Sequence, residues 1–406
     1  MAVGLEENTE LHPVMGIKLA ACSAGIYKKQ RLDLALIECT QGTSVAAVFT
    51  RNAFCAAPVV VAREHLDKCN PLYLLINAGN ANAGLGKAGY EAALQTCHHL
   101  AELRGCNRNA ILPFSTGVIG EPLPVEKICN AIPELLDQLS EENWLQANRA
   151  ILTTDTVTKA VSRRITFNQH QITITGIAKG SGMIRPDMAT MLAFIGTDAA
   201  INSDILDDVI KHAVDKSFNS ISVDGDTSTN DACVIMATGK SGMPVINTPG
   251  SDIAIKFRDA VTEICIYLAQ AIVRDGEGAT KFVTLDIRHG IDSKECQIVA
   301  AAIAHSPLVK TALFASDPNW GRILAAIGRA EIDNLDVNKV TIYIGNICII
   351  DQGERSPDYN ESKGEKVFKE EEITITVDLN RGTENQLFWT CDFSYDYVRI
   401  NAEYRT

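Results

Sequence analysis

The sequence predicts an α+β protein, because segments with helical periodicity and segments with strand periodicity alternate along the chain. Apolar and polar residues alternate over residues 171–178, which is typical of a half-buried strand. Between Ile205 and Val214 the apolar residues recur every three to four positions, as they do on one face of a helix. Near residue 285 the order changes, with helices first and strands afterwards. We therefore expect a larger domain of residues 1–285 and a smaller α+β domain of residues 286–406 that closes over it.

The ends of several elements are marked by residues that commonly start or stop them. Ser203 is expected to be the N-cap of the helix that begins before Ile205. Gly276 is expected to lie just past the C-terminus of another helix, a place where glycine is common. The other elements that we expect are a strand at 72–77, helices at 90–104, 252–274, 293–304 and 319–329, strands at 339–350, 373–379 and 386–400, and a charged region at 351–372 that forms a solvated loop or edge.

The composition excludes some classes of function. The chain has 37 lysine and arginine residues against 50 aspartate and glutamate residues, a net charge of −13. A general nucleic-acid binder needs a basic face, so we expect no nucleic-acid partner. No run approaches the roughly 20 apolar residues of a membrane span, and the acidic N-terminus lacks a signal-peptide pattern. Twelve cysteines without a C-x-x-C pair favour reduced thiols in the cytoplasm and no metal site.

The most unusual segment is KGSGMIRPDMATML, residues 179–192. Gly180 and Gly182 permit positive φ angles and leave backbone amides uncovered, while Lys179 and Arg185 add two cations. One interpretation is an ordinary loop between two elements that forms an anion-binding nest. The other interpretation depends on the Ala-Thr pair near the end of the segment.

A threonine hydroxyl is a poor nucleophile near neutral pH unless a base lies beside it. An N-terminal threonine carries that base itself, because its α-amine titrates near pH ~7.7–8.0. An internal threonine acquires such an amine when its hydroxyl attacks the preceding carbonyl and water cleaves the resulting ester. Thr190 is a candidate for this reaction, and the small Ala189 on the acyl side leaves room for the tetrahedral intermediate.

Two other motifs have weaker functional interpretations. Residues 84–89 fit G-x-G-x-x-G, but the acidic residue expected near position 109 for ribose binding is missing, so dinucleotide binding is not favoured. The segment SVDGDTSTND, residues 222–231, has three aspartates but lacks the rest of a calcium-binding EF-hand loop. It is interpreted either as a polar wall of the active site or as a cluster of Asx turns that organises the loop.

The 179–192 segment resembles the cleavage signature of the ornithine acetyltransferase family, also called glutamate N-acetyltransferases. Further blocks resemble that family in the same order and span nearly the whole chain, which makes the resemblance highly specific. These blocks are NAGNANAG (77–84), FSTGVIGEPLP (114–124), ILTTDTVTK (151–159), SVDGDTSTND (222–231), RDGEGATK (274–281), SDPNWGRI (316–323) and RINAEYRT (399–406).

The resemblance implies a four-layer αββα sandwich of the N-terminal-nucleophile type and self-cleavage between Ala189 and Thr190. The products would be an α chain of residues 1–189 and a β chain of residues 190–406, assembled as two of each in a heterotetramer. Thr190 would then be the catalytic nucleophile. Thr116 and Gly117 would form the oxyanion hole, a role that suits a backbone amide without a side chain.

The resemblance also implies the substrates. The enzyme would transfer an acetyl group from N-acetyl-L-ornithine to L-glutamate in arginine biosynthesis, with no cofactor. Some members also accept acetyl-CoA as donor, and we expect this bifunctional form. Hydroxyls and a cation suit a substrate carboxylate, and a carboxylate suits an ammonium group. The substrate-binding residues that carry over are Thr153, Lys179, Thr190, Glu277, Asn401 and Thr406.

Two alternatives stay open. An N-terminal-nucleophile amidohydrolase or aminopeptidase would use the same self-cleavage and the same nucleophile, but water would deacylate it. A non-enzymatic small-molecule binder would remain uncleaved. A denaturing gel distinguishes the uncleaved binder from the two self-cleaving enzymes. The ratio of acetyl transfer to acetate release distinguishes the amidohydrolase from the transferase.

Overall fold

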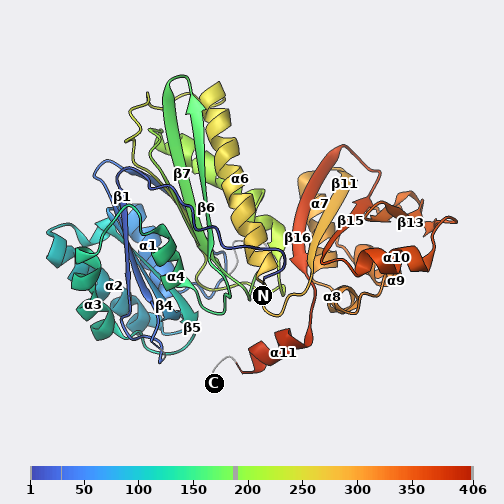
Figure 1. Cartoon of the computed structure of the whole chain (residues 1–406), viewed down its shortest axis with the longest axis horizontal. Helices are drawn as coiled ribbons and strands as arrows, with labels where there is room; N and C mark the ends of the chain where they lie inside the picture. The colour runs from blue at the N-terminus through green and yellow to red at the C-terminus, as the bar shows by residue number, and fades with distance from the viewer. Residues whose placement is uncertain (1, 29, 186–190, 404–406) are drawn as a thin grey trace.

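A computed structural model describes residues 2–28, 30–185 and 191–403. The expected α+β class is confirmed, since helices and three β-sheets make up the fold (Figure 1). The first sheet has the order β1-β2-β4-β5 and the second has the order β3-β10-β8-β7-β6. Their strands are β1 (Ile17–Cys22), β2 (Leu34–Cys39), β4 (Tyr73–Asn80), β5 (Ile111–Val118), β3 (Ser44–Phe49), β10 (Ala232–Ala237), β8 (Leu192–Thr197), β7 (His170–Lys179) and β6 (Lys159–Phe167).

The first two sheets pack face to face and form the inner layers of an αββα sandwich. Phe114 of β5 meets Phe194 of β8 edge to face, with ring centroids 5.2 Å apart. Trp144 is fully buried in the same apolar core and lies against Gly196, where any side chain would collide with the indole ring. The two sheets are thereby fixed to each other.

Helices cover the outer faces of both sheets. The first sheet is covered by α1, α2 and α3, and the second by α5 and α6, while α4 packs at the edge between the sheets. Their bounds are α1 (Ala57–Leu66), α2 (Gly86–Arg104), α3 (Val125–Asp137), α4 (Trp144–Ile151), α5 (Ser203–Asp215) and α6 (Asp252–Arg274). The four-layer sandwich is confirmed.

The third sheet has its own apolar core and lies to the right in Figure 1. Its order is β14-β13-β12-β15-β11-β16-β9. Because β9 reaches it from the middle of the chain, the division into residues 1–285 and 286–406 stays a prediction. The remaining elements are β9 (Ile221–Ser222), β11 (Phe282–Gly290), α7 (Ser293–Ala304), α8 (Pro307–Phe314), α9 (Trp320–Gly328), β12 (Thr341–Ile344), β13 (Ile347–Asp351), β14 (Glu354–Arg355), α10 (Glu361–Phe368), β15 (Glu372–Asp378), β16 (Glu384–Cys391), α11 (Tyr395–Ala402), and 3₁₀ turns at Arg108–Ala110, Phe218–Ser220 and Val337–Lys339.

Two expectations about local structure are wrong, and a third is correct only in part. The N-cap of α5 is Asn202, whose side chain accepts from the Asp204 amide, so Ser203 is the first helical residue. The strand expected at 386–400 ends at Cys391, because Ser394 caps a new helix, α11. The region at 351–372, expected as a solvated loop or edge, contains the edge strand β14 as the second alternative has it, but it also contains the helix α10.

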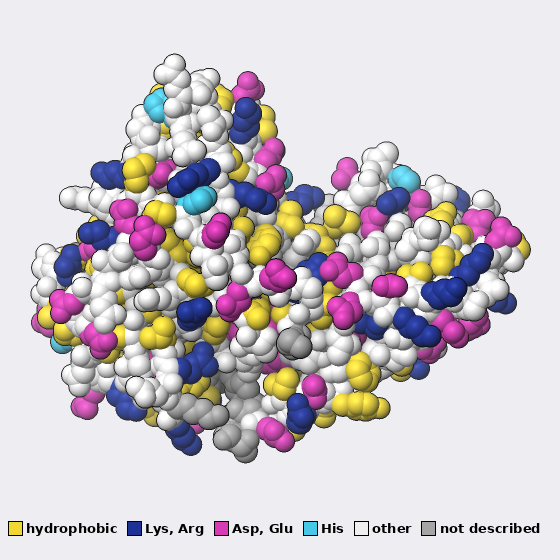
Figure 2. Space-filling model, viewed as in Figure 1, with side chains coloured by type: hydrophobic (Ala, Val, Ile, Leu, Met, Phe, Trp, Pro, Cys, Tyr) yellow, Lys and Arg dark blue, Asp and Glu magenta, His cyan; other side chains and the backbone are white. Residues whose placement is uncertain are grey.

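The described surface is mixed in charge. On the face in Figure 2, lysine and arginine side chains are interspersed with aspartate and glutamate side chains. All twelve cysteines are unpaired. Within the described part of the chain no single helix is long and apolar enough to cross a membrane, and α7 and α8 reach that length and composition only together, across a 60° bend.

Candidate active site

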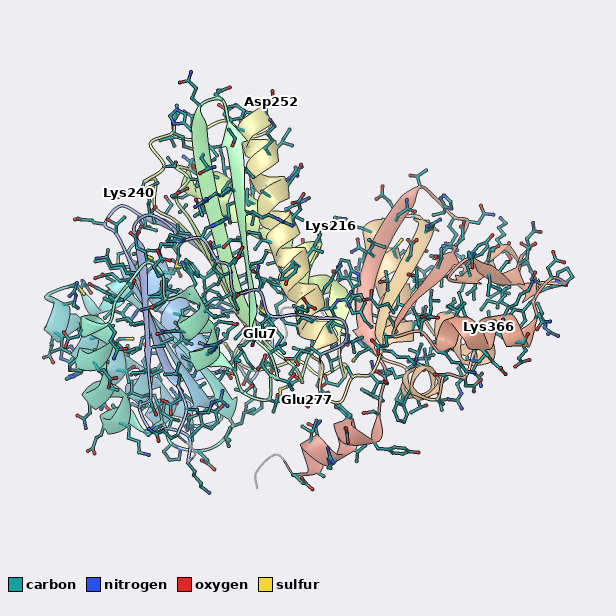
Figure 3. The ribbon with its side chains drawn as sticks, in the orientation of Figure 1. Glu7, Lys216, Lys240, Asp252, Glu277 and Lys366 are labelled. Atoms are coloured by element: carbon teal, nitrogen blue, oxygen red, sulfur yellow. The ribbon has the colours of Figure 1, made fainter. Side chains whose placement is uncertain are left out.

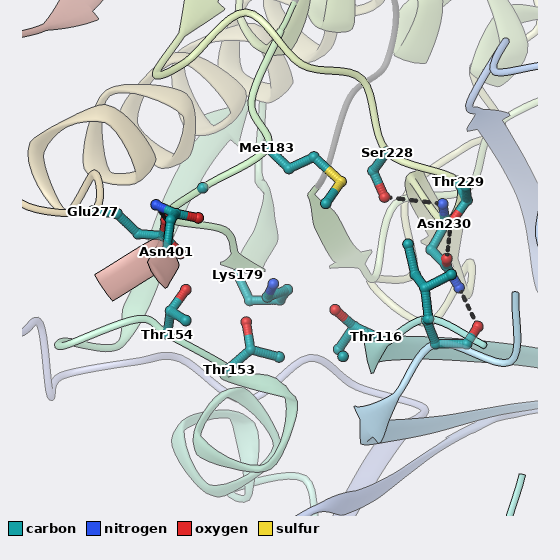
Figure 4. Close-up of a pocket in the computed structure, with 14 residues that line it drawn as sticks. Thr116, Thr153, Thr154, Lys179, Met183, Ser228, Thr229, Asn230, Glu277 and Asn401 are labelled. Atoms are coloured by element: carbon teal, nitrogen blue, oxygen red, sulfur yellow. Dashed lines mark hydrogen bonds between the residues drawn. The ribbon is translucent and has the colours of Figure 1, made fainter. Parts of the chain in front are cut away.

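Six of the residues predicted for the site line one pocket, although they are spread over most of the sequence (Figure 4). The empty volume of this pocket is about 600 Å³, including space that is open to solvent. The six are Thr116, Gly117, Thr153, Lys179, Glu277 and Asn401. The other three predicted residues, Ala189, Thr190 and Thr406, lie outside the described residues.

Thr116 and Gly117 lie at the end of β5, where the strand runs beside β4. Gly117 has a φ of +131°, and a Cβ there would lie 2.4 Å from the carbonyl carbon of Gly79 in β4. Only glycine fits this backbone. Thr116 is buried beside it, so the strand end offers the pocket a close-packed backbone and one hydroxyl.

The loop of residues 222–231 lines the pocket beside Thr116, through Ser228, Thr229 and Asn230. Asn230 donates from its side-chain amide to the carbonyl oxygens of Ala81, at 2.7 Å, and Ser115, at 3.0 Å. Its own backbone amide donates to Ser228 Oγ at 3.1 Å, as Figure 4 shows. Both interpretations of SVDGDTSTND therefore hold: the loop lines the pocket, and side chain-to-backbone turns organise it.

Lys179 is a buried cation at the end of β7, only 3% exposed. Its ammonium nitrogen is 4.0 Å from Asp155 Oδ2. Burial lowers the pKa of Lys179, although Asp155 opposes that shift. The amine therefore gives up its proton more readily than an ordinary lysine, while as a cation it points a charge into the pocket that Asp155 only partly neutralises.

A second buried lysine, Lys159, lies closer to Asp155 than Lys179 does. Lys159 Nζ is 2.7 Å from Asp155 Oδ1 and 2.6 Å from Asp275 Oδ2, and none of the three side chains is more than 1% exposed. Burial favours the neutral forms, but the Lys159 and Lys179 charges outweigh it and hold the pKa of Asp155 far below its usual range. The network ties the 153–159 segment to the connection between α6 and β11.

Glu277 lies in that connection, just below the C-terminal end of α6 (Figure 3). It is 7% exposed, and its backbone amide donates to Ser181 O at 2.9 Å. A Cβ on Gly182 would lie 2.4 Å from the Glu277 carboxyl carbon. Gly182 is therefore required for the Glu277 side chain to fit.

The last helix brings Asn401 into the pocket from near the C-terminus. The Asn401 side-chain amide donates to Glu277 Oε2 at 2.8 Å. Helix α11 is held in place at its start, where Ser394 Oγ donates to Gly278 O at 2.6 Å and the Phe393 and Tyr397 rings stack 4.5 Å apart.

Other residues of the site carry no strong signal in the sequence. Asp275 and Lys159 are 116 positions apart, and nothing in their local pattern predicts that they pair. Asp231 is a third such residue, a fully buried acid whose Oδ1 accepts from the Met191 amide at 2.9 Å. Only their occurrence inside the quoted sequence blocks singles them out.

A cavity that combines a buried cation, a buried carboxylate and a glycine backbone at a strand end, set in an αββα sandwich, is suited to an enzyme that acts on a small charged molecule. Comparison with known proteins identifies the class more closely. The sequence profile described as the ArgJ family matches residues 18–406. The chain is 53% identical to the arginine biosynthesis bifunctional protein ArgJ of Pseudomonas fluorescens (strain Pf0-1), over 100% of both chains. It is 52% identical to the protein of that name from Methylococcus capsulatus, over 98% of this chain and 97% of that one.

Among solved structures, an ornithine acetyltransferase from Mycobacterium tuberculosis, complexed with ornithine, is 31% identical. It covers 43% of this chain and 92% of its own, with a TM-score of 0.40. The full-length matches show that the chain belongs to the ArgJ family. It is an acetyltransferase of arginine biosynthesis.

Proposed function

We propose that the enzyme moves an acetyl group from N-acetyl-L-ornithine to L-glutamate through an acetyl ester on Thr190. The observation that carries the proposal is the convergence of Lys179, Glu277 and the Thr116–Gly117 strand end on one pocket. These groups match the charges of an amino acid and of an oxyanion, and family membership supplies the reaction class.

The reaction has two halves. In the first half, Thr190 Oγ attacks the acetamide carbonyl carbon and the developing oxyanion lies against Thr116 and Gly117. The C–N bond breaks, the acetyl group stays on Oγ, and ornithine leaves with the proton from the Thr190 hydroxyl, relayed by the Thr190 α-amine. In the second half, the α-amine of glutamate attacks the ester and the C–O bond breaks. A proton returns to Oγ, and N-acetyl-L-glutamate leaves.

The two substrates share an α-carboxylate and a nitrogen on the α-carbon, but their side chains carry opposite charges. Lys179 and Thr153 are suited to the shared carboxylate, because a desolvated cation and a hydroxyl both favour an anion. Glu277, oriented by Asn401, is suited to the ammonium group that each half-reaction presents. The same residues therefore serve both amino acids.

Self-cleavage is compatible with the fold. A break between Ala189 and Thr190 would leave β7 in one fragment and β8 in the other, and these strands pair along their length, Ile174 with Thr197 through Lys179 with Leu192. The fragments would therefore stay together. We further propose an assembly of two α and two β chains in the cytoplasm, and acetyl-CoA as a second donor. Size-exclusion chromatography with light scattering tests the assembly, and incubation with acetyl-CoA and glutamate tests the donor.

The central test uses the purified full-length protein. A denaturing gel should show two fragments, 1–189 and 190–406, and Thr190→Ala should show one band. Mass spectrometry after incubation with N-acetyl-L-ornithine should place the acetyl group on Thr190. Acetyl transfer to glutamate should far exceed acetate release. Acetate release in excess would instead favour the amidohydrolase, and an active, uncleaved wild type would overturn the proposal.

A further inference from the structure

Lys310 of α8 is a fully buried lysine that does not line the active-site pocket. Its side chain is 1% exposed, and its Nζ donates to the Cys391 carbonyl and to Thr390 Oγ1, the latter at 3.1 Å. Its backbone carbonyl accepts from the Phe393 amide at 3.2 Å. Burying an amine costs free energy unless it is hydrogen-bonded. Lys310 therefore holds the segment of residues 390–393, where β16 ends and just before α11 begins.

A series of ring contacts continues from Lys310 into α11. Lys310 Nζ lies 4.6 Å from the centroid of the Phe393 ring, which is a cation–π distance. The Phe393 ring stacks on Tyr397 at 4.5 Å, with 16° between the two planes. The Tyr397 carbonyl accepts from the Asn401 side-chain amide at 3.0 Å. The same amide donates to Glu277 Oε2, so these contacts join Lys310 to the carboxylate of the pocket.

Helix α11 depends on such contacts because it does not pack into an apolar core. None of its residues is buried, and in Figure 1 it lies apart from the three sheets. A helix of eight residues is only marginally stable in water by itself. Its other contacts include Ser394 with Gly278, Phe314 with Tyr395 and Tyr397 with Asp224. Lys310 acts on the segment that precedes the helix, and so sets the direction in which the helix leaves β16.

We propose that Lys310 is a positioning residue for substrate binding, because it fixes the start of α11 and thereby the place of Asn401 beside Glu277. This inference rests on the proposed function, in which Glu277 receives the substrate ammonium group. Asn401 is seven residues beyond Ser394, about 10 Å along the helix axis. A change of about 10° in the direction of the helix would move Asn401 by about 2 Å and break its hydrogen bond to Glu277.

Lys310→Met tests the inference, because it removes the amine and keeps most of the side-chain volume. We expect it to raise KM for N-acetyl-L-ornithine about tenfold with little change in kcat, since the loss falls on Asn401 and Glu277. Added to Asn401→Ala, it should raise KM little further, because both substitutions act through the same contact. Phe393→Leu interrupts the ring contacts without removing the lysine, and should raise KM by a smaller factor.

Lys281→Met is the matched control. Lys281 is also buried, 6% exposed, but its Nζ donates to the Glu370 carbonyl at 3.0 Å rather than to residues 390–393. The control variant loses a buried amine and its hydrogen bond, as Lys310→Met does. It should nevertheless keep KM near the wild-type value, because its side chain has no contact with the start of α11.

Hydrogen–deuterium exchange of the purified proteins gives a second measurement, which is independent of activity. Lys310→Met should speed the exchange of amides in residues 395–402, and Lys281→Met should not. If Lys310→Met does not fold, Phe393→Leu decides by the same two measurements.

Unchanged exchange in α11, or a KM that stays at the wild-type value, would overturn the inference and leave the proposed function intact. Full additivity of Lys310→Met and Asn401→Ala would also overturn it. A wild type that transfers no acetyl group would instead overturn the proposed function, and with it the role of Lys310 in binding.

Discussion

The Asn401 side-chain amide donates to Glu277 Oε2 over 2.8 Å, and so joins the last helix of the chain to the connection between α6 and β11. Glu277 has its backbone tied to Ser181, so the carboxylate is positioned from two sides. Both residues line the pocket. Residues that are 124 positions apart are thereby joined in one wall of the cavity.

Removal of the Asn401 amide should weaken substrate binding more than catalysis. A hydrogen bond to a charged acceptor contributes about 1.5–3 kcal/mol when it is shielded from water. Because the bond from Asn401 to Glu277 is partly exposed, we expect Asn401→Ala to raise KM about tenfold, with little change in kcat. Steady-state kinetics with N-acetyl-L-ornithine measures both constants. Val398→Ala on the same helix is the control, because Val398 is 66% exposed. Identical constants for the two variants would exclude a binding role for Asn401.

Gly182→Ala should act through Glu277. The new Cβ would lie 2.4 Å from the Glu277 carboxyl carbon and would displace the carboxylate, which we expect to lower kcat/KM about 100-fold. A double-mutant cycle checks the cause: added to Glu277→Ala, the Gly182 substitution should cost little more. Full additivity of the two losses would show that Gly182 acts elsewhere. Gly328→Ala in α9 is the control, because a Cβ there meets open space.

The sequence predicts the layers of this fold better than it predicts its polar interior. The sequence predicts the helix at 252–274 with the bounds that α6 has, because Gly276 marks its end, and the structure adds Ser251 as its N-cap. Helix α11 was predicted as a strand because Tyr395, Tyr397 and Val398 favour strands, whereas the Ser394 cap and the stacking of Tyr397 on Phe393 decide for a helix. Both interactions are local, between residues two to four positions apart, so the missed signal is Ser394 as a helix N-cap.

Contacts between segments that are distant in the sequence limit what can be predicted about the site. Resemblance to a family indicated Lys179 and Glu277, because those residues lie in quoted blocks of sequence. It did not indicate that Lys159 pairs with Asp155 and Asp275, since the pairing depends on how β6 and the α6–β11 connection meet in space. Residues that act through other residues are the part of a site that a linear pattern shows least.

Lys159 should be essential for stability. Replacing it with methionine would leave two buried carboxylates without their shared cation, so we expect Lys159→Met to lower the free energy of unfolding by about 3–5 kcal/mol. Urea denaturation at neutral pH measures the change. Lys87→Met is the control, because the Lys87–Glu91 pair is exposed and contributes about 0.5 kcal/mol or less. Similar losses of unfolding free energy for both variants would mean that the buried network stabilises the fold no more than an exposed ion pair does.

The Lys159 variant should also change how stability depends on acid. The folded pKa of Asp155 lies below its unfolded value, so its stabilisation is present above the unfolded pKa, near 4, and is lost as the pH falls toward the folded pKa. Without Lys159 this depression should shrink. The difference in unfolding free energy between wild type and Lys159→Met should therefore narrow below about pH 4. A difference that stays constant from pH 7 to pH 3 would contradict the assignment.

His305 gives the fold a separate sensitivity to acid. Its ring packs near Gly225 of the 222–231 loop, and its Nε2 has no hydrogen-bond partner among the described residues. Burial lowers the pKa of His305 to about 4, and the charges of Arg185 and Lys310 add to the shift. Between its ordinary pKa of 6.5 and about 4, the unfolded chain binds a proton that the folded protein does not bind. Stability must therefore fall as the pH drops through this window, by up to about 3 kcal/mol for this group.

His305→Gln removes the titrating group and should flatten that part of the pH profile. Thermal unfolding of wild type and variant at several values between pH 7 and pH 4 gives the comparison, and the difference between the two proteins isolates this residue from the carboxylates that titrate nearby. His98→Gln serves as the control, since His98 is an exposed residue of α2. If the profiles of wild type and His305→Gln run parallel down to pH 4, the folded protein must bind the proton at His305 as readily as the unfolded chain does.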